Sequence, residues 1–592
     1  MAAKHAGEHP PWQDRFRAPR WSLPRWARLA PDRCVLTGDP TGTVEVYAWS
    51  PGGVPRQVTD RPKGTSEVTI DPAGTHVWWF ADTDGDEFGI WRRQPWAGAP
   101  GSDVPAIDGV RAAYPAGLAF ADGGRIAIGG SDDGGSTLWA CDPGLPPRVL
   151  YQHVEDAHVA AISRDGTVVA ITHSERGDSR RPAIRLLHWD GAAVADLDDG
   201  PDRGLHVIGF LGSSGDLLVG HERHGRDDLL IWSPESGVVR ELDLPLDGEI
   251  SATPAPDGTW LAVVAEFRGR TSVHRYDVRS GTLTALETPT GMVEGIRVRP
   301  DGNAWYYWSS ASSPPTVVDL HAADVLPPPG EPVAAPSVPV TDVVADGPGG
   351  PVHAFVRTPP GSPPWATVFH IHGGPTWNDS DSWDVRSATW VDAGYAVVSV
   401  NYRGSTGYGQ AWRDAIEAAP GLVELEDIAA VRDAVVASGT ADPARCVLAG
   451  GSWGGFLTLL GLGTQPELWA CGSAAVPVAD YVAAYDDEME GLKAFDRSLF
   501  GGSPADVPET YRRASPLTYV DAVRAPMLIL AGANDPRCPI RQIDNYVDAL
   551  VRLGKEHDVY RFDAGHGSYV ADERIRQMQA ELDYVLRHVP PR

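Results

Sequence analysis

The first 330 residues repeat a pattern of short strands and turns, and this repeat constrains the fold more than any other feature. Each unit has an apolar strand, a turn resembling Pro-Asp-Gly, a second apolar strand, a polar turn and a third strand. The turn centres fall at Asp32, Ala73, Asp122, Asp165, Ser214, Asp257 and Asp301, spaced by 41, 49, 43, 49, 43 and 44 residues. A period in the forties with several strands per unit is typical of β-propeller blades. The sequence therefore predicts a seven-bladed propeller; the alternative is a run of unrelated hairpins or two sandwiches.

The second half of the chain has a different pattern. A proline-rich stretch at 327–332 is typical of a stiff connector, and beyond it apolar strands such as 367–371 and 395–400 alternate with helical segments such as 425–437. This alternation indicates a mostly parallel, doubly wound α/β sheet. We predict four parts: an N-terminal segment 1–20, the propeller 21–328, a linker 329–345 and an α/β domain 346–592. Residues 478–520 are predicted to be an inserted helical segment lining the cleft.

A Gly-x-Ser-x-Gly motif marks a candidate nucleophile. Ser452 follows the apolar strand 446–449 and precedes the helix-like segment 456–460, which is the context of a nucleophile elbow. Such a serine needs a sharp, strained turn with small neighbours, and glycines occupy positions 450, 451, 454 and 455. An incidental serine in a glycine-rich turn is the alternative when the motif is taken alone.

Two further residues complete a candidate triad. In this kind of fold the chain order is serine, then an acid, then histidine. Asp535 follows the apolar strand 526–532, and His566 lies between glycines after the strand-like run 556–562. Each alone is also compatible with an ordinary loop residue. Three residues in the expected order, each at a strand end, predict a Ser452–His566–Asp535 triad.

The oxyanion hole is predicted to consist of backbone N–H groups. Gly374 lies in a His-Gly-Gly-Pro loop after the strand 367–371, and Trp453 directly follows the nucleophile. Each donor of this kind is worth about 3–4 kcal/mol in the transition state. We interpret His372 as a structural loop residue. The chain has no His-Glu-x-x-His motif and no paired cysteine spacing for zinc, so we expect neither a metal nor another cofactor.

With these motifs in hand, the chain resembles the prolyl oligopeptidase family of serine peptidases, and within it the acylaminoacyl-peptidase-like and dipeptidyl-aminopeptidase-like branch. The resemblance is strongest from about residue 350 and rests on the motifs at 372–375, 401–409, 450–455, 534–539 and 565–567. It implies a seven-bladed propeller that caps an α/β-hydrolase domain. It also implies that the N-terminal segment packs on the hydrolase domain. One departure is Trp453, where tyrosine is frequent in the family.

The resemblance implies that the propeller covers the site and admits short peptides or small amides and esters. Several residues are candidates for substrate contacts, and each has a structural alternative. The predicted turns that contain Glu175, Glu222 and Glu266 lie at matching points of three successive blades. These glutamates either bind the amino terminus of a substrate or belong to solvated turns. Candidates for a hydrophobic pocket, or for ordinary core packing, are Tyr481, Tyr485 and Phe495. Arg537 is either a cleft residue or half of a structural ion pair, and the acidic run 486–488 either attracts a cation or is a solvated helix face.

Charge and composition exclude several classes of partner. The formal charge of −29 argues against nonspecific nucleic-acid binding, which needs lysine and arginine against phosphate. No segment has the length and hydrophobicity expected of a membrane span, and the N-terminus lacks the apolar region of a signal peptide. Five cysteines are few and odd in number, which fits free thiols and a cytoplasmic location. The sequence is also compatible with a homo-oligomer.

Three functional hypotheses follow from these residues. The first is a serine aminopeptidase or oligopeptidase that acylates Ser452. The second is an amidase or esterase that removes an acyl or aminoacyl group from a small metabolite with the same triad. The third, which the intact triad disfavours, is a noncatalytic propeller scaffold.

Overall fold

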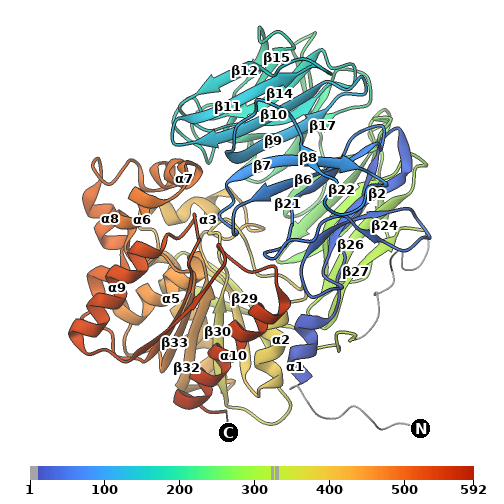
Figure 1. Ribbon diagram of the computed structural model, residues 1–592. Helices are drawn as coiled ribbons and strands as arrows, with labels where there is room; N and C mark the ends of the chain where they lie inside the picture. The colour runs from blue at the N-terminus through green and yellow to red at the C-terminus, as the bar shows by residue number, and fades with distance from the viewer. Residues whose placement is uncertain (1–10, 322–325, 327–331, 592) are drawn as a thin grey trace, which may run out of the picture.

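The computed structural model describes residues 11–321, 326 and 332–591, and these residues form a propeller beside an α/β-hydrolase domain (Figure 1). Seven small antiparallel sheets follow one another along the chain, and one eight-stranded sheet follows them. The predicted two-domain fold class is confirmed. The predicted boundary at 328/329 and the first ten residues of the predicted N-terminal segment lie outside the described residues. Within the described ranges, no helix has the length and apolarity to cross a membrane.

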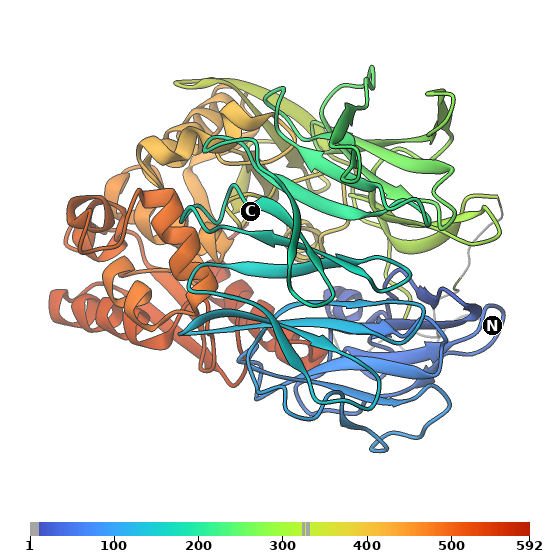
Figure 2. The ribbon, with the colours of Figure 1, turned by 90° about the horizontal axis from the view of Figure 1, so that it is seen from above.

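Successive blades lie side by side around the propeller, as the colour change from blue through teal to green shows from above (Figure 2). Blades 1 to 4 contain β1 (Arg25–Ala27), β2 (Ala30–Gly38), β3 (Glu45–Trp49), β4 (Arg56–Gln57), β5 (Val68–Ile70), β6 (His76–Asp82), β7 (Gly89–Pro95), β8 (Val104–Pro105), β9 (Tyr114–Phe120), β10 (Ile126–Asp132), β11 (Gly135–Cys141), β12 (Arg148–His153), β13 (Ala157–Ile162), β14 (Val168–His173), β15 (Ala183–His188) and β16 (Ala193–Leu197). Blades 5 to 7 contain β17 (Leu205–Phe210), β18 (Leu217–His221), β19 (Asp228–Ser233), β20 (Val238–Glu241), β21 (Glu249–Pro254), β22 (Trp260–Phe267), β23 (Arg270–Asp277), β24 (Leu283–Leu286), β25 (Met292–Val298), β26 (Ala304–Ser310) and β27 (Ser313–Asp319).

The predicted repeat corresponds to one hairpin per blade. Six of the seven predicted turn centres lie between the first and second strands of their blades. Asp32 is the exception, because β2 begins at Ala30 and the turn occupies residues 28–29 instead. A turn of two residues leaves the following Pro-Asp pair inside the strand, so the Pro-Asp signal was misleading there.

Side-chain packing joins the first and last blades. Blade 7 has three described strands, and its Trp305 ring lies 5.6 Å from the rings of Trp26 and Trp49 in blade 1. Leu36 and Val317 are buried in the same cluster. Apolar burial of this kind holds the ring together at this junction, and in the described residues the two blades share no strand.

The hydrolase sheet has the order β28-β29-β31-β30-β32-β33-β34-β35. Its strands are β28 (Thr341–Gly347), β29 (Gly350–Arg357), β30 (Trp365–Ile371), β31 (Ala396–Asn401), β32 (Ala441–Gly451), β33 (Cys471–Ala475), β34 (Met527–Gly532) and β35 (His557–Phe562). The pairs from β31 to β35 in this order are parallel, while β28 and β29 are antiparallel to their neighbours. Parallel strands end at one edge, where ligand sites of α/β sheets lie.

Helices cover both faces of this sheet and form two separate cores. They are α1 (Pro11–Arg17), α2 (Val385–Asp392), α3 (Gln410–Asp414), η1 (Ala415–Ala418), α4 (Leu422–Ala437), α5 (Trp453–Thr464), α6 (Tyr481–Asp487), α7 (Glu490–Phe500), α8 (Pro508–Ala514), η2 (Pro516–Tyr519), α9 (Ile540–Leu553) and α10 (Ala571–His588). Helix α1 lies beside α2 and α10 (Figure 1). It buries Trp12 and Phe16 there, and its Arg15 pairs with Asp392 of α2 at 2.7 Å. The start of the described chain thus packs on the hydrolase domain.

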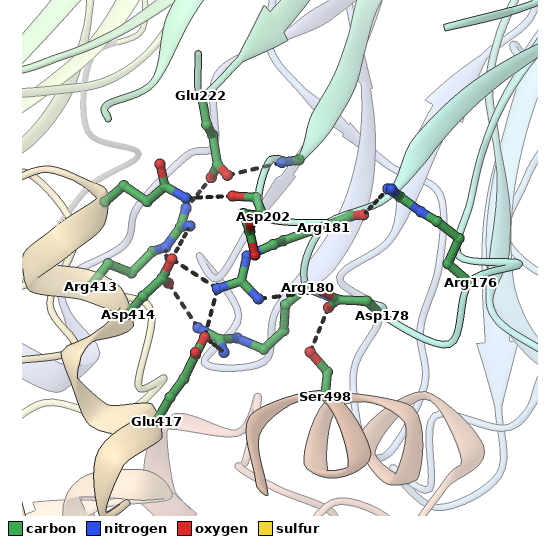
Figure 3. Close-up of polar contacts among 12 residues, drawn as sticks. Arg176, Asp178, Arg180, Arg181, Asp202, Glu222, Arg413, Asp414, Glu417 and Ser498 are labelled. Atoms are coloured by element: carbon green, nitrogen blue, oxygen red, sulfur yellow. Dashed lines mark hydrogen bonds and ion pairs between the residues drawn. The ribbon is translucent and has the colours of Figure 1, made fainter. Parts of the chain in front are cut away.

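A network of partly buried ion pairs joins blade 4 to the hydrolase domain (Figure 3). Arg180 and Arg181, on the loop between β14 and β15, both contact Asp414 and Glu417 at 2.6–3.0 Å. Burial opposes the charge of Asp414, but hydrogen bonds and charges from the surrounding arginines outweigh it and lower its pKa to about 2. Charged groups held this way orient the propeller over the edge of the sheet.

Candidate active site

Ser452 alone separates β32 from α5. Its dihedral angles, φ 56° and ψ −120°, lie where a residue with a side chain is strained. The turn is held by the Ser452 N–H, which donates to the Ala475 carbonyl at 2.9 Å, and by the Phe456 N–H, which donates to the Ser452 carbonyl at 2.8 Å. The serine is half-buried. This geometry is that of a nucleophile elbow.

The four glycines around the serine are not equivalent. A Cβ on Gly454 would lie 2.0 Å from the Ile371 carbonyl oxygen, and one on Gly450 or Gly455 would lie 2.6 Å from backbone atoms. A Cβ on Gly451 would meet nothing closer than 3.9 Å. Gly450, Gly454 and Gly455 are therefore required because the backbone packed against them, including that of β30 and β33, leaves no room for a Cβ. Gly451 has room for a side chain.

Asp535 and His566 form a bonded pair at the edge where β34 and β35 end. The His566 Nδ1 lies 2.8 Å from Asp535 Oδ2. The other carboxylate oxygen accepts the N–H groups of Arg537 and Cys538, each at 2.9 Å, and the Asp535 side chain is fully buried. Because every contact fixes the carboxylate, it orients the imidazole and stabilises a positive charge on it.

The serine and the histidine face the same edge from β32 and from the loop after β35. In the described residues, the Ser452 hydroxyl makes no hydrogen bond to the imidazole. Hydrogen bonds between a nucleophile and its base often tighten only when substrate binds. The structure thus joins the acid and the base directly and presents the serine in the conformation that a nucleophile requires.

The predicted oxyanion loop passes over the nucleophile. A Cβ on Gly373 would lie 3.3 Å from Ser452 Cβ and 3.8 Å from the Trp453 nitrogen. The backbone around Gly374 and the Trp453 N–H therefore converge next to the serine. His372 is buried, stacks on the Tyr402 ring at 4.2 Å, and its Nε2 lies 2.8 Å from Ser405 Oγ. Burial lowers the pKa of His372 to about 4, so it supports this loop as a neutral residue.

The predicted substrate residues divide into two groups. The charges of Glu175 and Glu222 are matched by Arg185 and Arg413. Glu266 has no cation as a partner among the described residues; it accepts a hydrogen bond from Asn378, three residues after the oxyanion loop, and burial raises its pKa. Of the three glutamates, Glu266 thus contacts a residue that lies close in sequence to the oxyanion loop.

The aromatic candidates and Arg537 have structural contacts. Tyr481 is 2% exposed and packs its ring edge-on against Trp453 and Phe456. Tyr485 accepts a hydrogen bond from Arg497, and the Phe495 ring lies beneath Arg180. Arg537 pairs with Glu87 of blade 2, across the domain interface. A cavity of about 400 Å³ lies beside this pair and opens onto His566.

Three potential metal ligands lie together at the site, namely Asp535, Cys538 and His566, with donor atoms within 4.8 Å of one another. One Asp535 oxygen is already bonded to His566 Nδ1. Burial raises the pKa of the Cys538 thiol well above its usual range, so the thiolate that a metal requires is disfavoured. The arrangement fits an acid–base pair better than a ligand set.

Sequence reasoning did not find the partners across the domain interface, such as Asn378 for Glu266 and Arg413 for Glu222. These residues have no distinctive spacing. The available signal was their position close to recognised motifs: Asn378 lies in the loop after β30, and Arg413 lies in the short helix α3 after the motif at 401–409.

Comparisons with known proteins agree with this geometry. Residues 381–591 match the family model of the prolyl oligopeptidase family, which confirms the resemblance. The acylamino-acid-releasing enzyme of Arabidopsis thaliana is 35% identical over 178 residues, covering 28% of this chain and 23% of that enzyme. Dipeptidyl aminopeptidase BIII of Pseudoxanthomonas mexicana is 27% identical over 338 residues, covering 55% of this chain and 43% of that enzyme. The chain thus spans less than half the length of these curated relatives.

The whole fold has close neighbours among solved structures. A puromycin-hydrolyzing peptidase of Mycobacterium tuberculosis superimposes with a TM-score of 0.81, covering 98% of this chain and 96% of that one. Its sequence identity of 22% shows that the fold is shared and nothing further.

Proposed function

We propose that this chain, whose catalytic domain belongs to the prolyl oligopeptidase family, is a serine peptidase that cleaves short peptides or aminoacyl and acyl amides. The observation that carries the proposal is the 2.8 Å bond between His566 and Asp535 at the same sheet edge as the strained Ser452. A strained serine and an oriented imidazole at the same sheet edge have little other use than nucleophilic catalysis.

The proposed reaction has two stages. His566 removes the proton of the Ser452 hydroxyl as the oxygen attacks the carbonyl carbon, and then gives that proton to the leaving amine. Asp535 keeps the imidazole oriented and stabilises its charged form. The Gly374 and Trp453 N–H groups bind the tetrahedral oxyanion, and water then hydrolyses the acyl-enzyme by the same steps in reverse.

Substrate size is proposed to be limited by the propeller. The ion pairs to blade 4, and the pair between Arg537 and Glu87 of blade 2, hold the propeller over the site from two sides. A folded protein would have to break these contacts to reach Ser452. We also propose a cytoplasmic location, which the five free, buried cysteines support.

A second candidate is an amidase or esterase that acts on a small molecule. It stays under consideration because one structural neighbour is, by its title, a puromycin-hydrolyzing peptidase, and puromycin is an aminoacyl amide. The triad serves both reactions equally, so the distinction lies in the substrate alone.

A substrate panel separates these functions. Aminoacyl anilides, blocked peptides and short acyl esters are compared by kcat/KM, with free and blocked amino termini side by side. We expect amide hydrolysis and labelling of Ser452 by a fluorophosphonate. Ser452→Ala should abolish both while the thermal unfolding midpoint stays within a few degrees. Turnover that persists in Ser452→Ala would remove the assignment.

A further inference from the structure

Two arginines of the propeller line a cavity without an anionic partner. Arg25 lies in β1 and Arg297 in β25, the first strands of blades 1 and 7. Both line a cavity of about 530 Å³ between blades 7, 1 and 2, to which Arg574 of α10 also contributes. The buried Arg297 Nε has no hydrogen-bond partner, and in the part of the chain that the structure describes no carboxylate lies within ion-pair distance of Arg25 or Arg297.

The three acids that line this cavity leave both arginines unpaired. Asp39 is bonded to Arg574 at 3.2 Å. The protein around the cavity raises the pKa of Glu294, which favours its neutral form. Glu67 is exposed and attracts Arg25 only from beyond ion-pair distance. The cavity therefore holds guanidinium groups that its own carboxylates do not neutralise.

The two guanidinium groups also repel each other. Burial, and after it the charge of Arg25, lowers the pKa of Arg297 to about 9. The Arg25 side chain is open to the cavity, yet the protein around the cavity lowers its pKa as well. Both shifts have the direction that partial loss of water and a like charge produce. At pH 7 both groups are still charged, so the folded chain carries two adjacent positive charges without a counterion.

This cavity adjoins the one that opens onto His566. Ser66 and Glu67, which precede β5 of blade 2, line both cavities. The Ser66 hydroxyl lies 3.0 Å from that of Tyr569, in the loop that carries His566. A group held by Arg25 and Arg297 would thus lie on the propeller side of the candidate active site, with the segment before β5 between them.

We propose that Arg25 and Arg297 form a binding site for an anionic group, a carboxylate or a phosphate, in the wall of the propeller. Guanidinium groups present a rigid fork of N–H donors that matches both anions, and hydrogen bonds between charged partners are the stronger kind. A cavity of about 530 Å³ has the size of an ordinary small-molecule site. Two sources supply this chemistry: the carboxyl group of a peptide substrate or product, and a phosphate from solution. The first source rests on the proposed function.

The test measures the binding of inorganic phosphate and of succinate to the full chain by calorimetry at constant ionic strength. We expect at least one of them to bind, and Arg25→Gln and Arg297→Gln each to weaken that binding about tenfold or more, the size of one charge-assisted hydrogen bond. Arg279→Gln changes an exposed arginine of the propeller outside this cavity and should leave binding unchanged. Absence of binding to the wild type, or equal binding by all three variants, would overturn the site.

Thermal unfolding separates loss of the site from loss of the fold. Arg25→Gln and Arg297→Gln each remove one of two like charges, so the unfolding midpoint without added anion should stay the same or rise. Phosphate or succinate should raise the midpoint of the wild type more than that of either variant. A midpoint that falls in both variants without added anion would contradict the absence of a partner within the chain.

A second measurement identifies the source of the anion. The ratio of kcat/KM is measured for short peptides with a free C-terminal carboxylate and for the same peptides as C-terminal amides. A preference for the carboxylate that Arg297→Gln removes, with activity on the amides retained, assigns the site to the substrate. A ratio that Arg297→Gln leaves unchanged, with calorimetric binding present, assigns it to a solute. If no peptide is cleaved, the proposed function fails, and the calorimetry alone supports or overturns the anion site.

Discussion

Gly454→Ala is expected to inactivate the enzyme, whereas Gly451→Ala, three residues earlier, is expected to be tolerated. The new Cβ at 454 would lie 2.0 Å from the Ile371 carbonyl oxygen and 2.9 Å from that of His372. Ordinary contacts begin near 3.4 Å, so β30 or the elbow must move by more than about 1 Å. At Gly451 the nearest atom is 3.9 Å away and no movement is needed.

The change in stability expected for Gly454→Ala follows from two opposing effects. Alanine in a helix gains up to about 1 kcal/mol over glycine, while overpacking of this kind costs about 1–3 kcal/mol or more. The clash therefore dominates. Because His372 begins the oxyanion loop, the movement separates Ser452 from its donors, and a displacement of about 1 Å costs on the order of 100-fold in rate.

The assay measures kcat/KM on an aminoacyl anilide together with the thermal unfolding midpoint of both variants. We expect Gly454→Ala to lose about 100-fold or more in kcat/KM. Gly451→Ala should stay within a few-fold of the wild type. Near-normal activity in Gly454→Ala, or equal damage in both variants, would refute the packing argument for the elbow.

The remaining predictions concern buried charges and the triad. Burial raises the pKa of Glu424 to about 8, so the native state holds a proton that the unfolded state has lost, and stability falls as pH rises from about 4.5 to about 8. Glu424→Gln, unlike the exposed Glu426→Gln, should lessen this fall by about 3 kcal/mol in urea unfolding at pH 5.5 and 8.5, and an unchanged fall would contradict it. The double variant Arg180→Met, Arg181→Met removes both arginines from the exposed Glu417 and leaves Asp414 paired with Arg413. It should destabilise the domain contact by about 1–3 kcal/mol, seen as faster proteolysis between the domains, while Arg176→Met, an exposed pair, should cost under about 1 kcal/mol. Asp535→Asn should lower kcat on the order of 10⁴-fold with little change in KM, because the imidazole loses its orienting charge; a large rise in KM alone would point to a structural role.

The sequence by itself determined the fold class and the order of the candidate triad. Strand and helix patterns are local, because alternation and helical periodicity reflect which side of a short segment is buried. The repeated hairpins therefore predicted seven blades, and Ser452, Asp535 and His566 each stood at the end of a recognisable strand. The turn predicted at Asp32 was wrong because a local pattern is not unique: a Pro-Asp pair is also tolerated inside a strand when the turn before it is short.

Only the tertiary structure decided which charges have partners and which glycines are required. The sequence predicts Glu222 and Glu266 at matching turns, yet Glu222 follows β18 and pairs with Arg413, whereas Glu266 lies in strand β22 and contacts Asn378. Asp487 and Glu488 are adjacent, yet Asp487 is paired with Arg541 at the surface, whereas Glu488 is buried and its Oε1 has no hydrogen-bond partner among the described residues. Such differences depend on partner groups that lie 54 to 191 residues away in the sequence, and on the direction in which the side chain points after a helix ends. Electrostatic and steric contacts depend on the distance between groups in the folded structure, and the order of residues in the chain does not give that distance.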